Sequence, residues 1–357
     1  MKKKRVFFDI GHPAHVHYFR NAMQLLQQAG HRVGVSARDK EMAHELLRSY
    51  GIPFVSRGRG GRGVLSKMLY LPLGVRRVFR AARAFRADLL VSFASPYAAW
   101  AARLLGVPHL AFDDTEHAGL AQRLYRPVTA LVLTPDCYRG PDFKRQRRFP
   151  SYMELSYLHP ARFTPDPGVL VQLGLRPGEK FVILRFVAWQ ASHDAGLKGF
   201  SASWKLRVTS ELARRARVFI SSEAPLAPEL EPWRFPLSPA AMHQALAFAD
   251  LLFGESATMA SEAAVLGTPA VYLDEVGRGY TSEQEARYGL VANFRPDAPG
   301  CAAALERGLA MLAAGRDSFK AQRDCLLAEK IDLTAFMLSL LENYPDSLSK
   351  LKASLEE

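Results

Sequence analysis

The sequence is poor in the features that mark several protein classes. Its 357 residues hold three cysteines, far apart and without C-x-x-C spacing, which excludes a disulfide framework and argues against a zinc knuckle or a redox pair. No apolar run approaches the roughly 18 residues needed to span a bilayer. The basic start at residues 2–5 resembles that of a signal peptide, but polar residues from Asp9 onward end the apolar run too early. We therefore expect a soluble cytoplasmic protein, or one that lies peripherally on the inner face of the membrane.

The composition is otherwise that of a globular protein. Hydrophobic residues make up 48% of the chain and charged residues 23%, which excludes a mainly disordered or collagen-like chain. At about 150 residues per domain, the length predicts two domains, each with enough apolar material for a core.

Charge is distributed unevenly between the two halves. Residues 1–150 contain 26 Lys and Arg against 10 Asp and Glu, whereas residues 151–357 contain 21 against 25. The net charges are therefore +16 and −4. This asymmetry indicates an anionic partner for the first half, such as phospholipid, nucleic acid or a phosphorylated substrate; the alternative is an arginine-rich surface that is only solvated.

Short apolar runs alternate with helical patterns along the whole chain, which is typical of parallel α/β sheets. In the first half the expected strands are 6–10, 32–36, 53–56, 89–93 and 109–112. In the second half they are 181–186, 218–221, 251–254 and 270–273. A proline-rich, aromatic stretch at 135–167 reads as the connection between domains. We predict two doubly wound, Rossmann-type domains, 1–160 and 161–330, facing a central cleft, with a C-terminal helix and tail at 331–357.

The most informative segment is residues 253–271. A predicted strand ends at Gly254, and Ser256 or Thr258 can cap the helix that follows, so that free N–H groups and the positive end of the helix dipole could bind phosphate. Glu262 lies one helical turn after Thr258, where a carboxylate can accept hydrogen bonds from a ribose diol. The alternative is a well-capped helix that binds nothing.

Small residues followed by the Glu-Ala-x-x-Leu-Gly-x-Pro pattern, here beginning at Glu262, resemble the donor-binding segment of GT-B fold glycosyltransferases and of UDP-sugar 2-epimerases. The resemblance implies a nucleotide-sugar site, with no metal or other cofactor. Its phosphate ligands would be Ser256, Ala257, Thr258 and Met259, and its ribose ligand would be Glu262.

The whole chain is more similar still to the domain-of-unknown-function 354 family of predicted glycosyltransferases. The segments that carry this resemblance are 9–19 (DIGHPAHVHYF), 113–118 (DDTEHA), 154–160 (ELSYLHP), 184–186 with 192–194 (LRF and SHD), and 277–281 (GRGYT). They imply a GT-B fold, whereas the reaction of that family is itself an inference.

Three histidines, His12, His15 and His17, crowd the end of the first predicted strand. Loops at that end of a parallel sheet open onto the ligand-binding crevice, and histidine titrates near neutral pH. The GT-B resemblance implies a general base that deprotonates the acceptor, with His15 as the best match and His12 as its rival. A three-histidine metal site is disfavoured by Pro13, and loop histidines that only cap the helix are the other alternative.

Acidic residues follow the strand at 109–112. Two neighbouring carboxylates can shift one another's pKa and so provide an acid and a base, which makes Asp114 and Glu116 catalytic candidates. The competing interpretation is structural, with Asp114 or Thr115 capping the next helix, and we favour a structural role for Asp113.

Further donor contacts are expected from the ends of other strands. Arg185 could bind the diphosphate, His193 and Asp194 could close over the donor, and Tyr280 and Thr281 could contact the sugar.

Arginines interleave with apolar residues along the predicted helix that ends at Arg86, next to the glycine-rich loop 57–63. This helix could lie on an anionic membrane and receive a lipid-linked acceptor, or it could simply pack on the sheet, which we favour. No aromatic RNA-recognition motif accompanies the charge, so a nucleic-acid partner is not expected.

Together these features predict a GT-B glycosyltransferase that moves a sugar from a nucleotide sugar, such as a UDP-sugar, to a glycan or lipid-linked acceptor. The alternatives are a UDP-sugar 2-epimerase that uses Asp114 and Glu116, and a noncatalytic protein whose basic first domain binds nucleic acid or a membrane.

Overall fold

The computed structural model describes residues 3–40, 42–60, 64–187 and 200–347. It divides into two compact units. One comprises the chain up to Tyr157 together with the segment that starts at Ile331, and the other comprises Leu158–Lys330. The C-terminal helix, which the sequence alone could not place, thus belongs to the first unit.

The first unit is built on a seven-stranded sheet in which every neighbouring pair runs parallel. Its strands are β1 (Arg5–Ile10), β2 (Arg32–Ala37), β3 (Val55–Ser56), β4 (Leu89–Phe93), β5 (His109–Phe112), β6 (Leu131–Pro135) and β7 (Gln146–Phe149). The spatial order is β3-β2-β1-β4-β5-β6-β7. The order reverses between β1 and β4, and in such sheets ligands bind beyond the carboxyl ends of the strands at this switch point.

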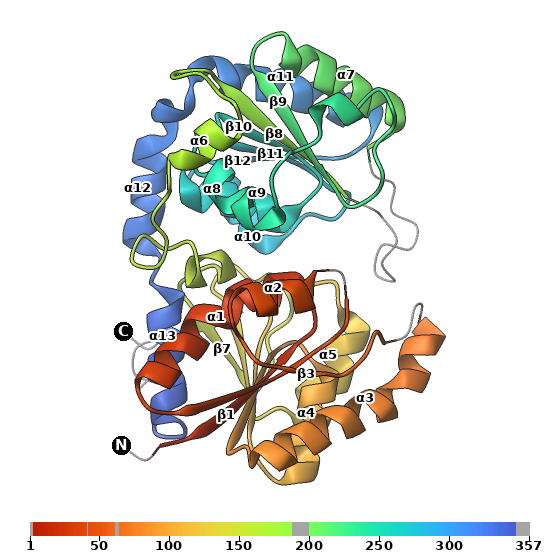
Figure 1. Ribbon diagram of the computed structural model, residues 1–357, viewed down its shortest axis with the longest axis vertical. Helices are drawn as coiled ribbons and strands as arrows, with labels where there is room; N and C mark the ends of the chain where they lie inside the picture. The colour runs from red at the N-terminus through yellow and green to blue at the C-terminus, as the bar shows by residue number, and fades with distance from the viewer. Residues whose placement is uncertain (1–2, 41, 61–63, 188–199, 348–357) are drawn as a thin grey trace. The chain divides into compact units, whose positions relative to one another are not determined.

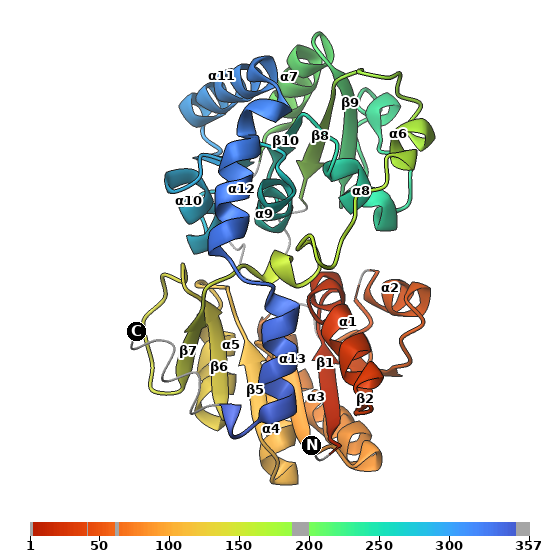
Figure 2. The same cartoon turned by 90° about the vertical axis from the view of Figure 1, so that its left-hand side faces the viewer.

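Helices cover both faces of this sheet (Figures 1 and 2). One face carries α1 (Pro13–Gln28), α2 (Ala43–Ser49) and α13 (Leu333–Asn343), and the other carries α3 (Val64–Phe85), α4 (Pro96–Leu105) and α5 (Gly119–Tyr125). None of the described helices combines the length and the hydrophobicity needed to cross a bilayer.

Helix α1 illustrates how the sequence builds this unit. Pro13 occupies the first helical position, where its missing N–H costs nothing. Buried apolar residues then recur with helical spacing, and the Phe19 ring packs against Phe112 of β5 at 5.7 Å between ring centroids. The C-terminal segment is tied to the same core, because the Thr334 hydroxyl donates to the Ser156 carbonyl at 2.5 Å.

The second unit has a five-stranded parallel sheet of order β12-β11-β10-β8-β9. Its strands are β8 (Phe181–Phe186), β9 (Arg217–Ser222), β10 (Leu251–Gly254), β11 (Ala270–Leu273) and β12 (Val291–Phe294). Helices α7 (Ala202–Ala213) and α11 (Ala298–Ala314) contact one another and the sheet. The remaining helices are α6 (Gly168–Gln172), α8 (Met242–Leu246), α9 (Ala257–Leu266), α10 (Gly279–Ala286) and α12 (Lys320–Glu329). The switch point of this sheet lies between β8 and β10.

The predicted α/β class, with two doubly wound parallel sheets, is confirmed. Three strands were not predicted from the sequence: β6, β7 and β12. Strand β7 lies inside the stretch interpreted as an interdomain connection, and that interpretation is wrong for residues 146–149. Its sequence, QRRF, has no apolar run because it is the edge strand of the sheet.

Candidate functional site

The carboxyl ends of β8 and β10 meet at the switch point of the second unit. Gly254, the last residue of β10, is in register with Arg185 of β8. A Cβ on Gly254 would lie 2.1 Å from the Arg185 carbonyl oxygen, so only glycine permits this approach of the two backbones. The close pairing brings the start of α9 directly beside the end of β8.

Helix α9 begins at this switch point, directly after β10. The Ser256 hydroxyl caps it by accepting the Met259 N–H at 3.3 Å, as the sequence predicts for this residue. Ser256, Ala257 and Thr258 are partly exposed, whereas Met259 is buried. The first turn therefore presents backbone N–H groups and the positive end of the helix dipole at the switch point, an arrangement suited to phosphate.

The expected ribose ligand, Glu262, lies on the second turn of α9 and is 5% exposed. Its Oε1 accepts a hydrogen bond from His243 Nε2 of α8 at 2.9 Å. This bond fixes the orientation of the carboxylate. His243 was not predicted from the sequence, because it lies 19 residues before Glu262 and no local pattern connects the two.

A second buried carboxylate, Glu255, was also missed although it directly follows β10. Its two oxygens accept the N–H groups of Val187 at 3.1 Å and of Phe200 at 2.6 Å, and Lys205 Nζ lies 3.8 Å away. Glu255 thus holds the two residues that bound the undescribed segment 188–199. The donor contacts expected from His193 and Asp194 lie in that segment, outside the described residues.

The guanidinium of Arg185 turns toward β9. It donates to the Ser221 hydroxyl at 2.8 Å and to Glu223 Oε1 at 2.5 Å. Its Nε is buried and makes no hydrogen bond within the described residues. The structure therefore places Arg185 next to the start of α9, with two of its nitrogens engaged by neighbouring side chains. Its contact with a diphosphate stays a prediction.

Tyr280 and Thr281 form the first turn of α10, and both are buried. The Thr281 hydroxyl donates to the Arg278 carbonyl at 3.1 Å, and Arg278 pairs with Asp274 at 3.2 Å. In this geometry the Thr281 side chain stabilises the turn that precedes α10. The expected sugar contacts of these two residues stay predictions.

In the first unit, the three histidines lie at the start of α1 rather than in a loop. His12 is the N-cap, and its Nδ1 accepts the Ala14 N–H at 3.2 Å. His17 stacks on Tyr157, with 5.3 Å between ring centroids. His15 packs against Phe93 of β4 at 4.7 Å.

The hydrogen bonding of His15 determines what its ring can do. Nδ1 accepts the Gly11 N–H at 3.2 Å, so the neutral ring carries its proton on Nε2 and donates from that atom. Burial, with smaller contributions from His12, Lys40 and Arg57, holds the pKa of His15 well below its usual range. His15 is therefore neutral at pH 7 with a donor at Nε2, which does not favour the expected role of general base.

The acidic loop after β5 is held by internal hydrogen bonds. Asp113 is fully buried and accepts the Tyr125 hydroxyl at 2.5 Å and the Thr115 N–H at 3.0 Å. Burial raises its pKa to about 6 despite these bonds. The expected capping of the next helix by Asp114 or Thr115 is wrong, because α5 starts at Gly119 and has Ala118 as an N-cap without a side-chain bond.

The two catalytic candidates of this loop differ in exposure. Asp114 is buried and its Oδ1 accepts the Thr115 hydroxyl at 3.2 Å. Glu116 is partly exposed and accepts the Arg139 N–H at 3.4 Å.

A buried ion pair occupies the end of β1, and the sequence analysis did not identify it. Asp9 Oδ1 accepts from Arg57 Nε at 3.0 Å, and the two residues are 1% and 3% exposed. The signal was present, because Asp9 is a carboxylate within an otherwise apolar strand. Its partner lies 48 residues further along the chain, which sequence spacing does not show.

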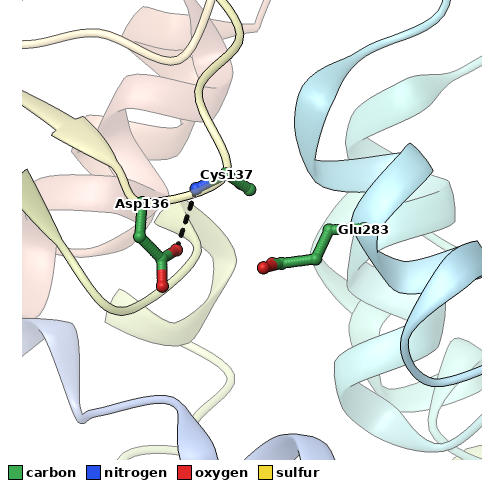
Figure 3. A group of neighbouring side chains, drawn as sticks. All are labelled: Asp136, Cys137 and Glu283. Atoms are coloured by element: carbon green, nitrogen blue, oxygen red, sulfur yellow. Dashed lines mark hydrogen bonds between the residues drawn. The ribbon is translucent and has the colours of Figure 1, made fainter.

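The cysteines at positions 137, 301 and 325 are all free thiols. The Cys137 N–H donates to Asp136 Oδ1 at 3.0 Å in the turn after β6 (Figure 3). Glu283 of α10, labelled in the same figure, pairs with Lys330 at 2.9 Å. The expectation that the protein uses no metal and no other cofactor stays a prediction.

Helices α3 and α4 lie side by side and carry an apolar groove on their outer surface. The groove is lined by Leu71, Pro72, Val75, Arg76, Phe79, Trp100 and Leu104. The opposite side of α3 packs on the sheet, where Val78 and Ala82 contact Phe7 and Leu90. One face of α3 therefore packs on the sheet, as we favoured, and another face exposes apolar residues together with Arg76. The contact of this helix with a membrane stays a prediction.

Comparisons with known proteins agree with this architecture. The model of a family described as "Protein of unknown function (DUF354)" matches residues 4–174. Comparison with the sequences of curated proteins gives no match. Among solved structures, Acinetobacter baumannii MurG is 16% identical, with 96% of this chain and 100% of that chain covered and a TM-score of 0.60.

Two further solved structures show the same fold. A UDP-N-acetylglucosamine 2-epimerase is 12% identical, with 98% of this chain and 97% of that chain covered and a TM-score of 0.67. The spinosyn rhamnosyltransferase SpnG, in complex with spinosyn aglycone, is 14% identical, with 94% and 99% covered and a TM-score of 0.61. The resemblance predicted from the sequence is therefore confirmed: residues 4–174 match the DUF354 family, and the chain has the fold of GT-B glycosyltransferases and UDP-GlcNAc 2-epimerases.

Proposed function

We propose that this protein is a glycosyltransferase that binds a nucleotide sugar, such as a UDP-sugar, on its second unit. The observation that carries the proposal is the start of α9, a capped and partly exposed helix N-terminus at a sheet switch point, with a buried carboxylate one turn further on. The N–H groups of residues 257–259 would bind the diphosphate, and Glu262, oriented by His243, would bind the ribose.

The leaving diphosphate is stabilised at the same place. As the bond between sugar and diphosphate breaks, negative charge develops on the phosphate oxygens next to the helix N-terminus. Arg185 adds a positive charge from the neighbouring strand. Because its Nη atoms already contact Ser221 and Glu223, a rotation of its side chain would accompany donor binding.

The first unit would bind the acceptor, a glycan or a lipid-linked sugar, whose hydroxyl attacks the anomeric carbon. A general base must take the proton from this hydroxyl group. The resting hydrogen bonds of His15 and His12 leave both rings with a donor at Nε2, so we assign the base to the loop that holds Asp114 and Glu116. Glu116 is the more exposed of the two and is therefore the more accessible to an acceptor.

The exposed groove between α3 and α4 supports a peripheral contact with an anionic membrane. Two residues of the groove, Trp100 and Leu104, are 39% and 64% exposed, and Leu73 of α3, next in the chain to Pro72 of the groove, is 43% exposed. The same two helices carry exposed arginines at positions 76, 80, 83 and 103. Apolar side chains flanked by cations match a bilayer with acidic headgroups, and such a contact would bring the enzyme to a lipid-linked acceptor.

The donor site is tested by thermal unfolding in the presence of UDP, ADP, GDP and CDP. A ligand that binds the folded chain at about 100 times its Kd adds about 2.7 kcal/mol of stability, which corresponds to a rise in Tm of a few degrees. We expect such a rise with at least one of the nucleotides, and a much smaller rise for Glu262→Gln. The matched control is Glu229→Gln, an exposed glutamate of the same unit.

The reaction is tested on the nucleotide sugar whose diphosphate binds best. A transferase releases the nucleoside diphosphate only when an acceptor is added, whereas an epimerase changes the sugar without releasing it. Conversion of the sugar on the intact nucleotide, lost in Asp114→Asn and Glu116→Gln, would replace the transferase assignment by the epimerase one.

A further inference from the structure

Buried polar groups surround the carboxyl end of β1. The Asp9 carboxylate accepts the Ser36 hydroxyl at 2.8 Å, the Ser95 hydroxyl at 2.6 Å and Arg57 Nε at 3.0 Å. Three donors from three different segments therefore satisfy this carboxylate within the protein. Asp9 acts as an anchor that holds Arg57 in place.

The Arg57 guanidinium is held in place, but not all of its nitrogens have hydrogen-bond partners within the described residues. Its Cζ lies 4.4 Å from the centroid of the Tyr97 ring, and the Arg57 carbonyl accepts from Arg77 Nη1 at 2.7 Å. Nη1 is buried and has no hydrogen-bond partner within the described residues. A buried guanidinium N–H group without a hydrogen-bond partner destabilises the folded protein. A bound ligand that accepts a hydrogen bond from this group would remove that cost.

Gly11 leaves space beside this guanidinium. A Cβ on Gly11 would lie 3.5 Å from Arg57 Nη2 and 3.5 Å from His15 Cε1. An atom placed above Gly11 would thus contact both the Arg57 guanidinium and the His15 ring. Both groups are donors, because His15 Nδ1 already accepts the Gly11 N–H and leaves the proton on Nε2.

The local field is positive. Helices α1 and α4 both begin at this end of the sheet, with His12 and Ser95 as their N-caps. Lys40 and Arg57 are close enough to contribute to the low pKa of His15. Asp9 offsets one of these charges and is itself satisfied, so the two side chains next to Gly11, Arg57 and His15, donate hydrogen bonds and favour negative charge.

We propose that the space above Gly11 is a phosphate subsite, in which Arg57 Nη1 and Nη2 and His15 Nε2 donate to the oxygens of a phosphate group. This inference rests on the proposed function and specifies the acceptor of that reaction. Since the nucleotide is assigned to the second unit, the phosphate bound in the first unit belongs to the acceptor. A sugar linked to a lipid through phosphate is such an acceptor. His15 then binds the acceptor as a neutral donor.

The test uses inorganic phosphate as the probe and the His15 ring signals in NMR spectra as the readout. We expect the Cε1–H and Nε2–H signals of His15 to shift with phosphate and saturate, and not to shift with sodium chloride of equal ionic strength. Gly11→Ala fills the space with ordinary 3.5 Å contacts at an unstrained backbone position, so the variant should fold. Its phosphate affinity should fall at least tenfold.

The matched control is Gly119→Ala in the same unit, where no atom lies within 4 Å of the added Cβ. It should bind phosphate like the parent protein. No movement of the His15 signals in the parent protein, or equal phosphate affinity in Gly11→Ala, would overturn the subsite.

Repeating the phosphate titration with saturating UDP tests whether the subsite holds a phosphate of the acceptor or a phosphate of the nucleotide. Phosphate binding that persists with UDP bound supports an acceptor group, whereas displacement of phosphate by UDP overturns the assignment to the acceptor. Loss of the UDP response in Tm concerns only the second unit, so the proposed function and the phosphate subsite can fail independently.

Discussion

Gly254 of β10 lies in register with Arg185 of β8, and a Cβ on Gly254 would come within 2.1 Å of the Arg185 carbonyl oxygen. This close approach joins the two strands at the switch point where α9 begins. The donor site proposed for the second unit depends on it, because the end of β8 and the first turn of α9 form its two sides.

Gly254→Ala should therefore destabilise the second unit. The added methyl group meets backbone rather than a flexible side chain, so the strands must separate, at a cost on the order of 3 kcal/mol. Urea denaturation followed by circular dichroism measures the loss. Gly119→Ala is the control, with an expected change below about 0.5 kcal/mol, and equal stability of the two variants would contradict the close approach.

Ser256→Ala should weaken both the helix and the nucleotide site. Loss of an N-cap costs about 1 kcal/mol, and a frayed first turn no longer aligns its N–H groups on the diphosphate. We expect calorimetric titration to show about fivefold weaker UDP binding, equivalent to about 1 kcal/mol. Ser201→Ala removes a cap with the same 3.3 Å bond from α7. It should lose similar stability and bind UDP normally; a matching loss of UDP affinity would argue against a direct role for α9.

The buried carboxyl of Asp113 should make stability depend on pH. Its pKa is raised to about 6 in the folded state, against about 3.9 in an unfolded chain. The folded state therefore binds the extra proton, and the stabilisation is complete below pH 4 and is lost as the pH rises through 6.

Asp113→Asn removes this titration. Between pH 4 and pH 7.5, the free energy of unfolding of the variant should rise by on the order of 3 kcal/mol relative to that of the parent protein. Urea denaturation at both pH values measures this change. The exposed Asp142→Asn serves as the control and should show no such trend. A pH-independent difference between Asp113→Asn and the parent would show that burial does not raise this pKa.

Leu104→Glu should weaken binding to anionic vesicles. Placing a charge where an exposed leucine would enter the bilayer removes roughly 1.5 kcal/mol or more, which is about tenfold in partition. Sedimentation with phosphatidylglycerol vesicles measures it, with phosphatidylcholine vesicles as the neutral reference. Leu120→Glu changes a similarly exposed leucine of α5, 51% exposed, and should have little effect. Equal losses in both variants, or equal binding to neutral vesicles, would exclude the α3–α4 groove as the contact.

Local sequence patterns sufficed to predict much of the fold and the start of α9. Apolar runs marked most of the interior strands, and the cap at Ser256 followed from residue type and position. The edge strand β7 was missed because only its ends are buried. Pairs that join distant segments, such as His243 with Glu262 and Arg57 with Asp9, were also missed. Tertiary packing sets such contacts. A carboxylate in an apolar strand, such as Asp9, can be noticed in the sequence, but a single sequence does not show which distant residue pairs with it.

The most direct test of the central claim is an NMR titration of the isotope-labelled protein with UDP, following backbone amides. The account predicts that the amide signals of Ala257, Thr258 and Met259 shift and saturate together, and that those of β6 in the first unit do not move. Saturable UDP binding that leaves these three amides unchanged, or no binding at all, would contradict the assignment of α9 as the nucleotide site.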